Sequence, residues 1–157
     1  MNDAEIIEKA KALLGDKLLE ASNPAVRRIF LKVDSKDLLK AVEVLKNDLG
    51  FAYLATISGL DIGENFEIIY HFGKPSSQLN LRTQVPKSNP HVDSICAVVP
   101  GAILYERELQ DMFGLVVDHI PDSRRLVLPD DWPAGNYPLR KDWKFERPLE
   151  KIPGGKS

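Results

Sequence analysis

The sequence predicts an α+β domain, with one antiparallel sheet of about four strands and helices packed on one face. Apolar residues recur at helical spacing near the N-terminus and again after Ser35, whereas three segments between residues 51 and 85 are strand-like. Short loops separate these segments, so consecutive strands are expected to pair antiparallel. Prolines crowd the last third of the chain and predict an extended tail there.

Two amphipathic helices are expected in the first fifty residues. Asn2 or Asp3 can cap the first helix, and Ser35 begins the second. Gly50 stands where a helix C-cap glycine belongs. The apolar face of the first helix is formed by Ile6, Ile7, Ala10, Leu13 and Leu14, and that of the second by Leu38, Leu39, Val42, Leu45 and Leu49.

Four strands are expected around the second helix. Residues 26–33 read as the first strand, because its branched and aliphatic residues share one side. Residues 51–58 are rich in aromatic and branched residues, and residues 59–63 form a turn after them. Residues 64–72 and 78–85 then alternate between apolar and polar positions.

The last regular elements precede the tail. Residues 91–99 are compatible with a short helix or a short strand, and residues 102–113 have the spacing of a third helix that ends at Gly114. The chain therefore divides into an α+β domain over residues 1–114 and a proline-rich, partner-wrapping tail over residues 115–157, within one domain overall.

Charge and cysteine content exclude several classes of function. The 157-residue chain carries 21 basic and 23 acidic side chains, a formal net charge of −2, which argues against broad binding to nucleic acid. Cys96 is the single cysteine, so an internal disulfide, an iron–sulfur cluster or a cysteine-rich zinc site cannot form on this chain alone. A reducing, intracellular compartment is expected.

No segment has the pattern of a secretory signal or of a membrane span. The N-terminus is acidic and amphipathic, unlike a signal peptide. The longest apolar run, residues 97–105, is far shorter than the roughly twenty residues that a spanning helix needs. We therefore expect that anything anchoring this protein to a membrane is another chain.

No catalytic or metal-binding pattern stands out. The histidines are too far apart for an HExxH set, and the aspartates after residue 117 lack the spacing of a calcium loop. Phosphate-binding glycine motifs and a GxSxG elbow are also missing from the sequence. Cys96 lies in an apolar stretch and reads as a buried, inert thiol. These observations favour a non-catalytic role.

The tail has the composition of a partner-binding surface. It carries both tryptophans, an Arg124-Arg125 pair and an Arg140-Lys141 pair, and tryptophan and arginine are enriched where proteins meet. The acidic residues of the third helix allow two readings. They form a solvated helix face, or Glu106, Glu108 and Asp111 receive the tail arginines, whose planar fork binds carboxylates bidentately.

These residues carry a resemblance to a known family. Glu106-Arg107-Glu108, Asp111-Met112-Phe113-Gly114, Arg124-Arg125-Leu126 and Pro138-Leu139-Arg140-Lys141-Asp142 resemble the signature of the C-subunit family of NADH:quinone oxidoreductase, respiratory complex I. The same family includes subunits of energy-converting, membrane-bound [NiFe] hydrogenases and formate hydrogenlyases. The form RRLVLPDDWPAGNYPLRKD is closer to this hydrogenase branch. Asp118-His119-Ile120-Pro121-Asp122 departs from the family's Gly-His-Pro-Asp.

The resemblance implies a structural subunit of a membrane-bound, ion-translocating redox complex. It implies no cofactor and no catalytic or metal-binding residue in this chain, with a [NiFe] centre and iron–sulfur clusters in the partners. The partners are a hydrogenase-like large subunit and an iron–sulfur small subunit, on the cytoplasmic side of the membrane. The implied interface consists of Glu106, Arg107, Glu108, Asp111, Phe113, Arg124, Arg125, Trp132, Pro138, Leu139, Arg140, Lys141 and Asp142.

Three alternatives remain beside this prediction. The chain could serve as the C-subunit of a quinone oxidoreductase that uses NADH, ferredoxin or F420. It could be a stand-alone enzyme in which Arg124, Arg125 and Arg140 clamp an anionic substrate. It could also bind nucleic acid through its basic pairs and by stacking on Trp132 or Trp143, although the net charge disfavours this.

Overall fold

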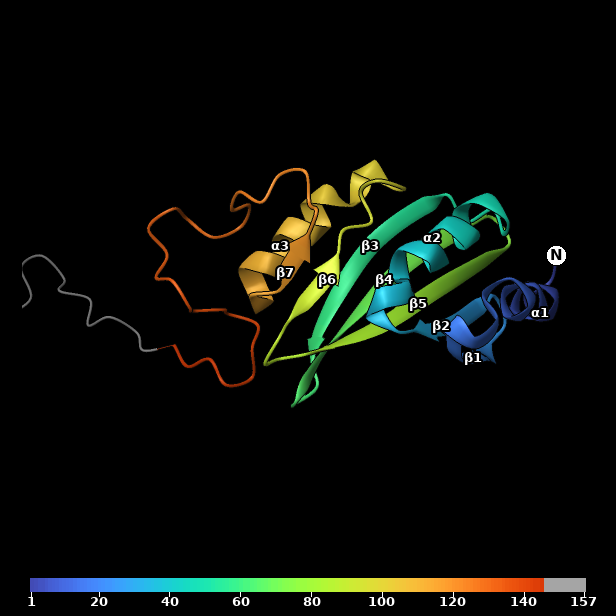
Figure 1. Ribbon diagram of the computed structural model, residues 1–157, viewed down its shortest axis with the longest axis horizontal. Coiled ribbons are helices and arrows are strands. Elements are labelled where there is room, and N and C mark those ends of the chain that lie inside the picture. Colours follow the sequence, from blue (N-terminus) through green and yellow to red (C-terminus); the bar gives the residue numbers. More distant parts are fainter. Residues whose placement is uncertain (146–157) are drawn as a thin grey trace, which may run out of the picture.

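A computed structural model describes residues 1–145, which build a five-stranded sheet of order β1-β2-β5-β4-β3 (Figure 1). Residues 146–157, the end of the expected tail, lie outside the described residues. The elements are α1 (Asp3–Leu14), β1 (Leu18–Ala25), β2 (Arg28–Val33), α2 (Leu38–Asn47), β3 (Tyr53–Asp61), β4 (Asn65–Lys74), β5 (Ser77–Pro86), β6 (His91–Asp93), α3 (Ile103–Phe113) and β7 (Val116–Asp118). Short 3-10 turns occupy Gly15–Lys17, Ser35–Asp37 and Pro100–Ala102.

The α+β class predicted from the sequence is confirmed. The sheet differs from the expected one in two ways: it has an extra strand, and one of its pairings is parallel. The sequence pattern did not indicate β1, an edge strand that forms an antiparallel hairpin with β2 and leaves most of its residues exposed. In addition, β2 pairs with β5 in parallel, while the other three pairings are antiparallel. The parallel pair arises because α2, β3 and β4 are inserted between two strands that are neighbours in the sheet.

The helices cover one face of the sheet, as predicted. Alternate residues of β4 and β5 are buried beneath them, among them Phe66, Tyr70, Leu79 and Leu81. α1 lies beside β1 and β2, α2 crosses the middle of the sheet, and α3 lies with β6 and β7 at the opposite end (Figure 1). The other sheet face is polar; on it the Arg82 guanidinium binds the Glu67 carboxylate at 2.7 Å.

The helix ends follow local chemistry. The Asn2 side chain accepts the N–H of Glu5 while the Glu5 carboxylate accepts the N–H of Asn2, a capping box at the start of α1. α3 ends, as predicted, at Gly114, whose φ of 70° is left-handed. α2 ends at Asn47, before the expected cap Gly50, because Asp48 takes the C-cap position.

The apolar faces predicted for α1 and α2 are mostly buried. Leu13 of α1 is the exception, with 42% of its surface exposed. Strand β3 begins two residues later than expected and continues through Gly59 to Asp61, so the turn before β4 is shorter than predicted. A Cβ atom on Gly59 would lie 2.6 Å from the Phe113 ring. Glycine at this position therefore lets α3 pack directly against β3.

Candidate partner-binding surface

Helix α3 holds the preceding loop through a buried carboxylate. Glu106 is 1% exposed and accepts the Ser94 hydroxyl at 2.6 Å, the Ile95 N–H at 2.7 Å and the Cys96 thiol at 3.2 Å. Burial, together with the nearby Glu106 charge, raises the pKa of Cys96 to about 11. The thiol is therefore protonated and inert at neutral pH, as the apolar sequence around it predicts.

A second buried carboxylate of α3 holds the tail. One oxygen of Asp111 accepts the consecutive backbone N–H groups of Leu126, Val127 and Leu128, at 2.9, 2.8 and 3.1 Å. Successive N–H groups that converge in this way form a concave anion-binding nest, and here the anion is part of the same chain. The irregular backbone after β7 is thereby fixed against α3 without forming a strand.

Two arginines, Arg107 on α3 and Arg125 in the tail, bind backbone carbonyl groups. Arg107 donates to the carbonyl oxygens of residues 124 and 125 at 2.7 and 2.9 Å. Arg125 donates to those of Pro129 and Trp132 at 2.7 and 3.0 Å. Within this chain neither reading of the α3 acids fits: Glu106 and Asp111 are buried rather than solvated, and neither accepts a hydrogen bond from a tail arginine. Arg107 and Arg125 instead satisfy carbonyl groups of a segment that has no regular hydrogen-bond ladder. Arg124 pairs with the Asp122 carboxylate.

Arg140 fastens the far end of the tail to the domain. Its Nε donates to the Phe113 carbonyl at 2.6 Å, and its guanidinium lies 5.1 Å from the Phe66 ring centre and 4.4 Å from that of Tyr137. A guanidinium that donates a hydrogen bond while it lies over two aromatic rings is better suited to these contacts than the ammonium of a lysine. A Cβ on Gly114 would meet the Tyr137 ring at 2.5 Å, so this contact also requires a glycine after α3.

Asp61, at the end of β3, is a third buried anchor, which the sequence patterns did not reveal. It accepts the N–H of Lys141 at 2.9 Å and that of Gly63 at 3.0 Å, and it pairs with the Lys87 ammonium at 2.6 Å. Burial alone would raise the pKa of Asp61, but these donors outweigh burial and lower it to about 2. Eighty residues separate Asp61 from Lys141, so no local spacing could have revealed the contact.

The start of the tail contains the segment that departs from the family pattern. His119 has a φ of 62°, a left-handed conformation that favours glycine. Aligned on Pro121-Asp122, the pattern Gly-His-Pro-Asp places its glycine at this position. His119 Nδ1 lies 3.1 Å from the Asp93 carboxylate. Hydrogen bonds from Arg124 hold the pKa of Asp122 well below its usual range.

The residues expected at the interface thus fall into two groups. Buried or half-buried side chains face the domain and hold the tail: Glu106, Arg107, Asp111, Phe113 and Arg140. Exposed residues are Glu108, Arg124, Arg125, Leu139, Lys141 and Asp142, and Trp132 and Pro138 are half-buried. Arg125 is exposed, but its guanidinium binds two carbonyl groups within the tail.

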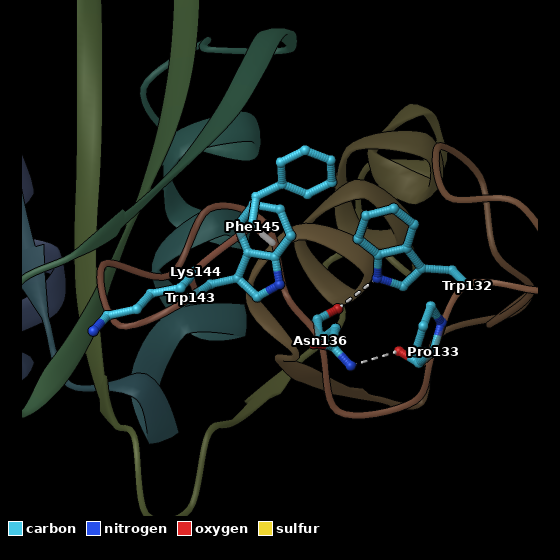
Figure 2. A pocket seen from close by; sticks show the side chains of 6 residues that line it. All are labelled: Trp132, Pro133, Asn136, Trp143, Lys144 and Phe145. Atoms are coloured by element: carbon cyan, nitrogen blue, oxygen red, sulfur yellow. Dashed lines mark hydrogen bonds between the residues drawn. The ribbon is translucent and has the colours of Figure 1, made fainter. Parts of the chain in front are cut away.

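The outer side of the tail carries apolar and aromatic groups. Leu126, Val127, Leu139 and Phe145 are exposed by 41, 56, 53 and 62%. Trp143 lies between Trp132 and Phe145, with ring centres 6.1 and 5.9 Å apart. These rings border a cleft of about 390 Å³, which Pro133, Asn136 and Lys144 also line (Figure 2). We call it the aromatic cleft.

Within residues 1–145, no three histidine, cysteine, aspartate or glutamate side chains gather in a way that could hold a metal ion. Among the described helices, none is long and apolar enough to cross a membrane.

A profile described as "Respiratory-chain NADH dehydrogenase, 30 Kd subunit" matches residues 31–148. The chain belongs to this family. Its similarity to the C-subunit of F420H2 dehydrogenase from Methanosarcina mazei is 32% identity over 92% of this chain and 93% of that protein. The C-subunit of NADH-quinone oxidoreductase from a Nocardioides species is also 32% identical, over 95% of this chain, but the chain spans only 62% of it.

Three further similarities follow: the first concerns the hydrogenase branch of the family, and the other two concern the fold. Formate hydrogenlyase subunit 5 of Escherichia coli is 50% identical over 64 residues, which are 41% of this chain and 11% of that protein. A chain of an archaeal membrane-bound sulfane sulfur reductase has the same fold, with a TM-score of 0.80 at 21% identity, over 90% of this chain and 85% of that one. A trypsin-resistant fragment of Nqo5 also matches, with a TM-score of 0.65 at 23% identity, over 78% of this chain and 99% of the fragment.

Proposed function

We propose that this 30 kDa-subunit homologue is a non-catalytic structural subunit of a membrane-bound, ion-translocating redox complex of the energy-converting [NiFe] hydrogenase type. It lies on the cytoplasmic side of the membrane and docks through the outer side of its tail. Its partners are the hydrogenase-like large subunit and the iron–sulfur small subunit, which hold the [NiFe] centre and the clusters.

The observation that carries the proposal is the arrangement of the tail. Buried acids and arginines hold its inner side to α3, while Leu126, Val127, Leu139 and Phe145 are left exposed on its outer side. Ordered apolar side chains rimmed by charge mark sites where another protein binds. The 50% identity to formate hydrogenlyase subunit 5 supports the hydrogenase branch.

A second candidate is the C-subunit of an F420H2- or NADH-type quinone oxidoreductase. The match to the F420H2 dehydrogenase protein favours it, because that match covers nearly all of both chains. The two candidates differ in the partner. A large subunit with two CxxC motifs, four thiolates able to hold nickel, indicates the hydrogenase type, and a large subunit without them indicates the quinone type.

The arrangement gives no support to an anion clamp. Arg125 and Arg140 are directed at backbone carbonyls within the chain, and Arg124 binds Asp122 at 2.7 Å. The three guanidinium groups therefore do not converge on a shared ligand position.

Affinity purification from solubilised membranes tests the proposal. A tagged full chain should bring down a hydrogenase-like large subunit and an iron–sulfur subunit. Leu139→Asp should reduce their recovery at least tenfold, because a charge would be buried unpaired in the interface. Leu19→Asp is the matched control, since Leu19 is similarly exposed, by 56%, on edge strand β1. Recovery of the wild-type chain without such partners would overturn the proposal.

A further inference from the structure

Lys74, the last residue of β4, lines a pocket that the proposed docking function does not use. The pocket has a volume of about 450 Å³ and lies where β3 begins and β4 ends, at the end of the sheet away from the tail (Figure 1). We call it the lysine pocket; its other lining residues are Gly50, Ala52, Tyr53, Gly73 and Pro75. Lys74 is half-buried there, so its amine is shielded from bulk water but still open to a small molecule in the pocket.

The Lys74 amine is held beside a second positive charge. Its Nζ donates to the Leu49 carbonyl at 3.3 Å, and the Lys9 Nζ donates to the preceding carbonyl, that of Asp48, at 2.8 Å. Two cationic side chains, one from α1 and one from β4, therefore converge on neighbouring carbonyl groups just after α2. The Lys74 Nζ also lies 4.5 Å from the centre of the Phe51 ring.

These surroundings act on the amine in opposite directions. Burial in the pocket wall and the charge of Lys9 favour the neutral amine and lower the pKa of Lys74, although the Asp3 carboxylate opposes them. The Phe51 ring and the Leu49 carbonyl also attract the charged form. Burial has the largest influence. A larger fraction of Lys74 is therefore unprotonated than of an exposed lysine, and the unprotonated amine is the nucleophile.

The lining of the lysine pocket selects the class of electrophile. Apart from Lys74, the only titratable side chain among the described residues that line it is that of Tyr53. An aldehyde that condenses with an amine must lose water, a step that an acid has to assist, and a phenol is a weak acid. The thiolate of an acyl thioester leaves without such assistance. Ala52, Pro75 and the Tyr53 ring offer apolar surface on which an acyl chain can pack.

We propose that Lys74, half-buried beside the Lys9 ammonium, is an acylation site that takes short apolar acyl groups from acyl thioesters. The neutral Nζ attacks the thioester carbonyl carbon and forms the C–N bond. The C–S bond breaks, the thiolate leaves with the electron pair, and the nitrogen loses a proton to water. The product is an amide that keeps one N–H for the Leu49 carbonyl, with its acyl chain against the pocket walls. The site lies away from the tail, so it does not depend on the proposed docking function.

Competitive acylation of the full-length chain tests the proposal. The chain is treated with a limiting amount of the hexanoyl or the acetyl thioester of N-acetylcysteamine, and peptide mass spectrometry gives the rate at each lysine. Lys74 should react about threefold or more faster than Lys36, because more of its amine is unprotonated. Lys36 is exposed and forms no ion pair within residues 1–145. The hexanoyl group should be preferred over acetyl at Lys74 but not at Lys36. A rate at Lys74 no greater than that at Lys36 would overturn the proposal.

A pair of variants tests the part played by the second lysine. Lys9→Met keeps an unbranched side chain and removes the charge, so acylation at Lys74 should slow by about twofold while that at Lys36 stays unchanged. Lys11→Met is the matched control, because Lys11 is exposed on the same helix and pairs with Glu8 at 2.8 Å instead. Equal rates at Lys74 in the two variants would contradict activation by Lys9 and overturn the proposal as stated.

Discussion

Replacement of Asp111 tests whether buried side chains hold the tail in place. The carboxylate is 7% exposed, and one of its oxygens accepts three backbone N–H groups. A hydrogen bond to a charged group contributes about 1.5–3 kcal/mol, and bonds that share one acceptor do not add in full. Asp111→Asn keeps an acceptor oxygen and should lower the free energy of opening the tail by about 2 kcal/mol. Asp111→Ala leaves three backbone N–H groups without their acceptor and should lower it by about 4 kcal/mol.

Hydrogen exchange measures this cost where it arises. The amide protons of residues 126–128 should exchange about 30-fold faster in Asp111→Asn, the factor that corresponds to about 2 kcal/mol of local opening. Urea unfolding of the same variant shows whether the tail opens alone or together with the sheet. Glu108→Gln is the control, because Glu108 is exposed on the same helix and its loss should leave these amides unchanged.

An unchanged exchange rate at residues 126–128 in Asp111→Ala would refute this reasoning. It would mean that the tail is held by its apolar contacts, such as that of half-buried Leu128 with the core, rather than by the carboxylate. A fall in global stability without faster local exchange would also contradict it, since the lost bonds all lie in one segment.

Three other outcomes are expected. Arg140→Ala and Arg140→Lys should both speed exchange of the Leu139 amide about tenfold or more, because lysine cannot replace a stacked, planar donor. The lowered pKa of Asp61, about 2 against an ordinary 3.8, stabilises the fold by about 2 kcal/mol above pH 4. That stability should be lost as the pH falls from about 4 to 2, and acid titration of Asp61→Asn should lack this step. His119→Gly should be more stable to urea than His119→Ala by about 1 kcal/mol, because both lose the Asp93 contact and only glycine relieves the positive φ.

Local patterns in the sequence were sufficient for most of the helices and strands, but not for β1 or for the pairing of β2. The alternation through Phe66 and Tyr70 and the helical spacing before Gly114 each depend on neighbours a few residues apart, and both were predicted. Strand β1 was missed because its exposed edge carries no apolar alternation. The parallel pairing of β2 with β5 was missed because it joins strands that are far apart in the chain.

That the tail binds a partner was predicted from its composition and stays a prediction. The contacts of the tail with the rest of the chain could not be read from the sequence, because Asp111 and Arg107 bind main-chain groups that every residue possesses. Asp61 reaches Lys141 across the whole fold. The aromatic cleft depends on Trp143 folding back toward Trp132, a contact set by the turns at the prolines between them.

Because the tail is ordered before docking, substitutions on its inner and outer sides should weaken docking in different ways. Fixing a free segment costs roughly 1–2 kcal/mol per residue, and a tail that became ordered only on docking would lose that much affinity. In this chain, the hydrogen bonds of Asp111 and Arg140 order the tail already in the free subunit, so the ordering cost does not reduce the affinity for a partner. Substitutions at these inner residues should therefore weaken docking in proportion to the local order that they remove. Substitutions at outer residues such as Leu139 should weaken docking with tail exchange rates unchanged. If inner and outer variants gave the same relation between exchange rate and partner recovery, preorganisation would play no part in docking.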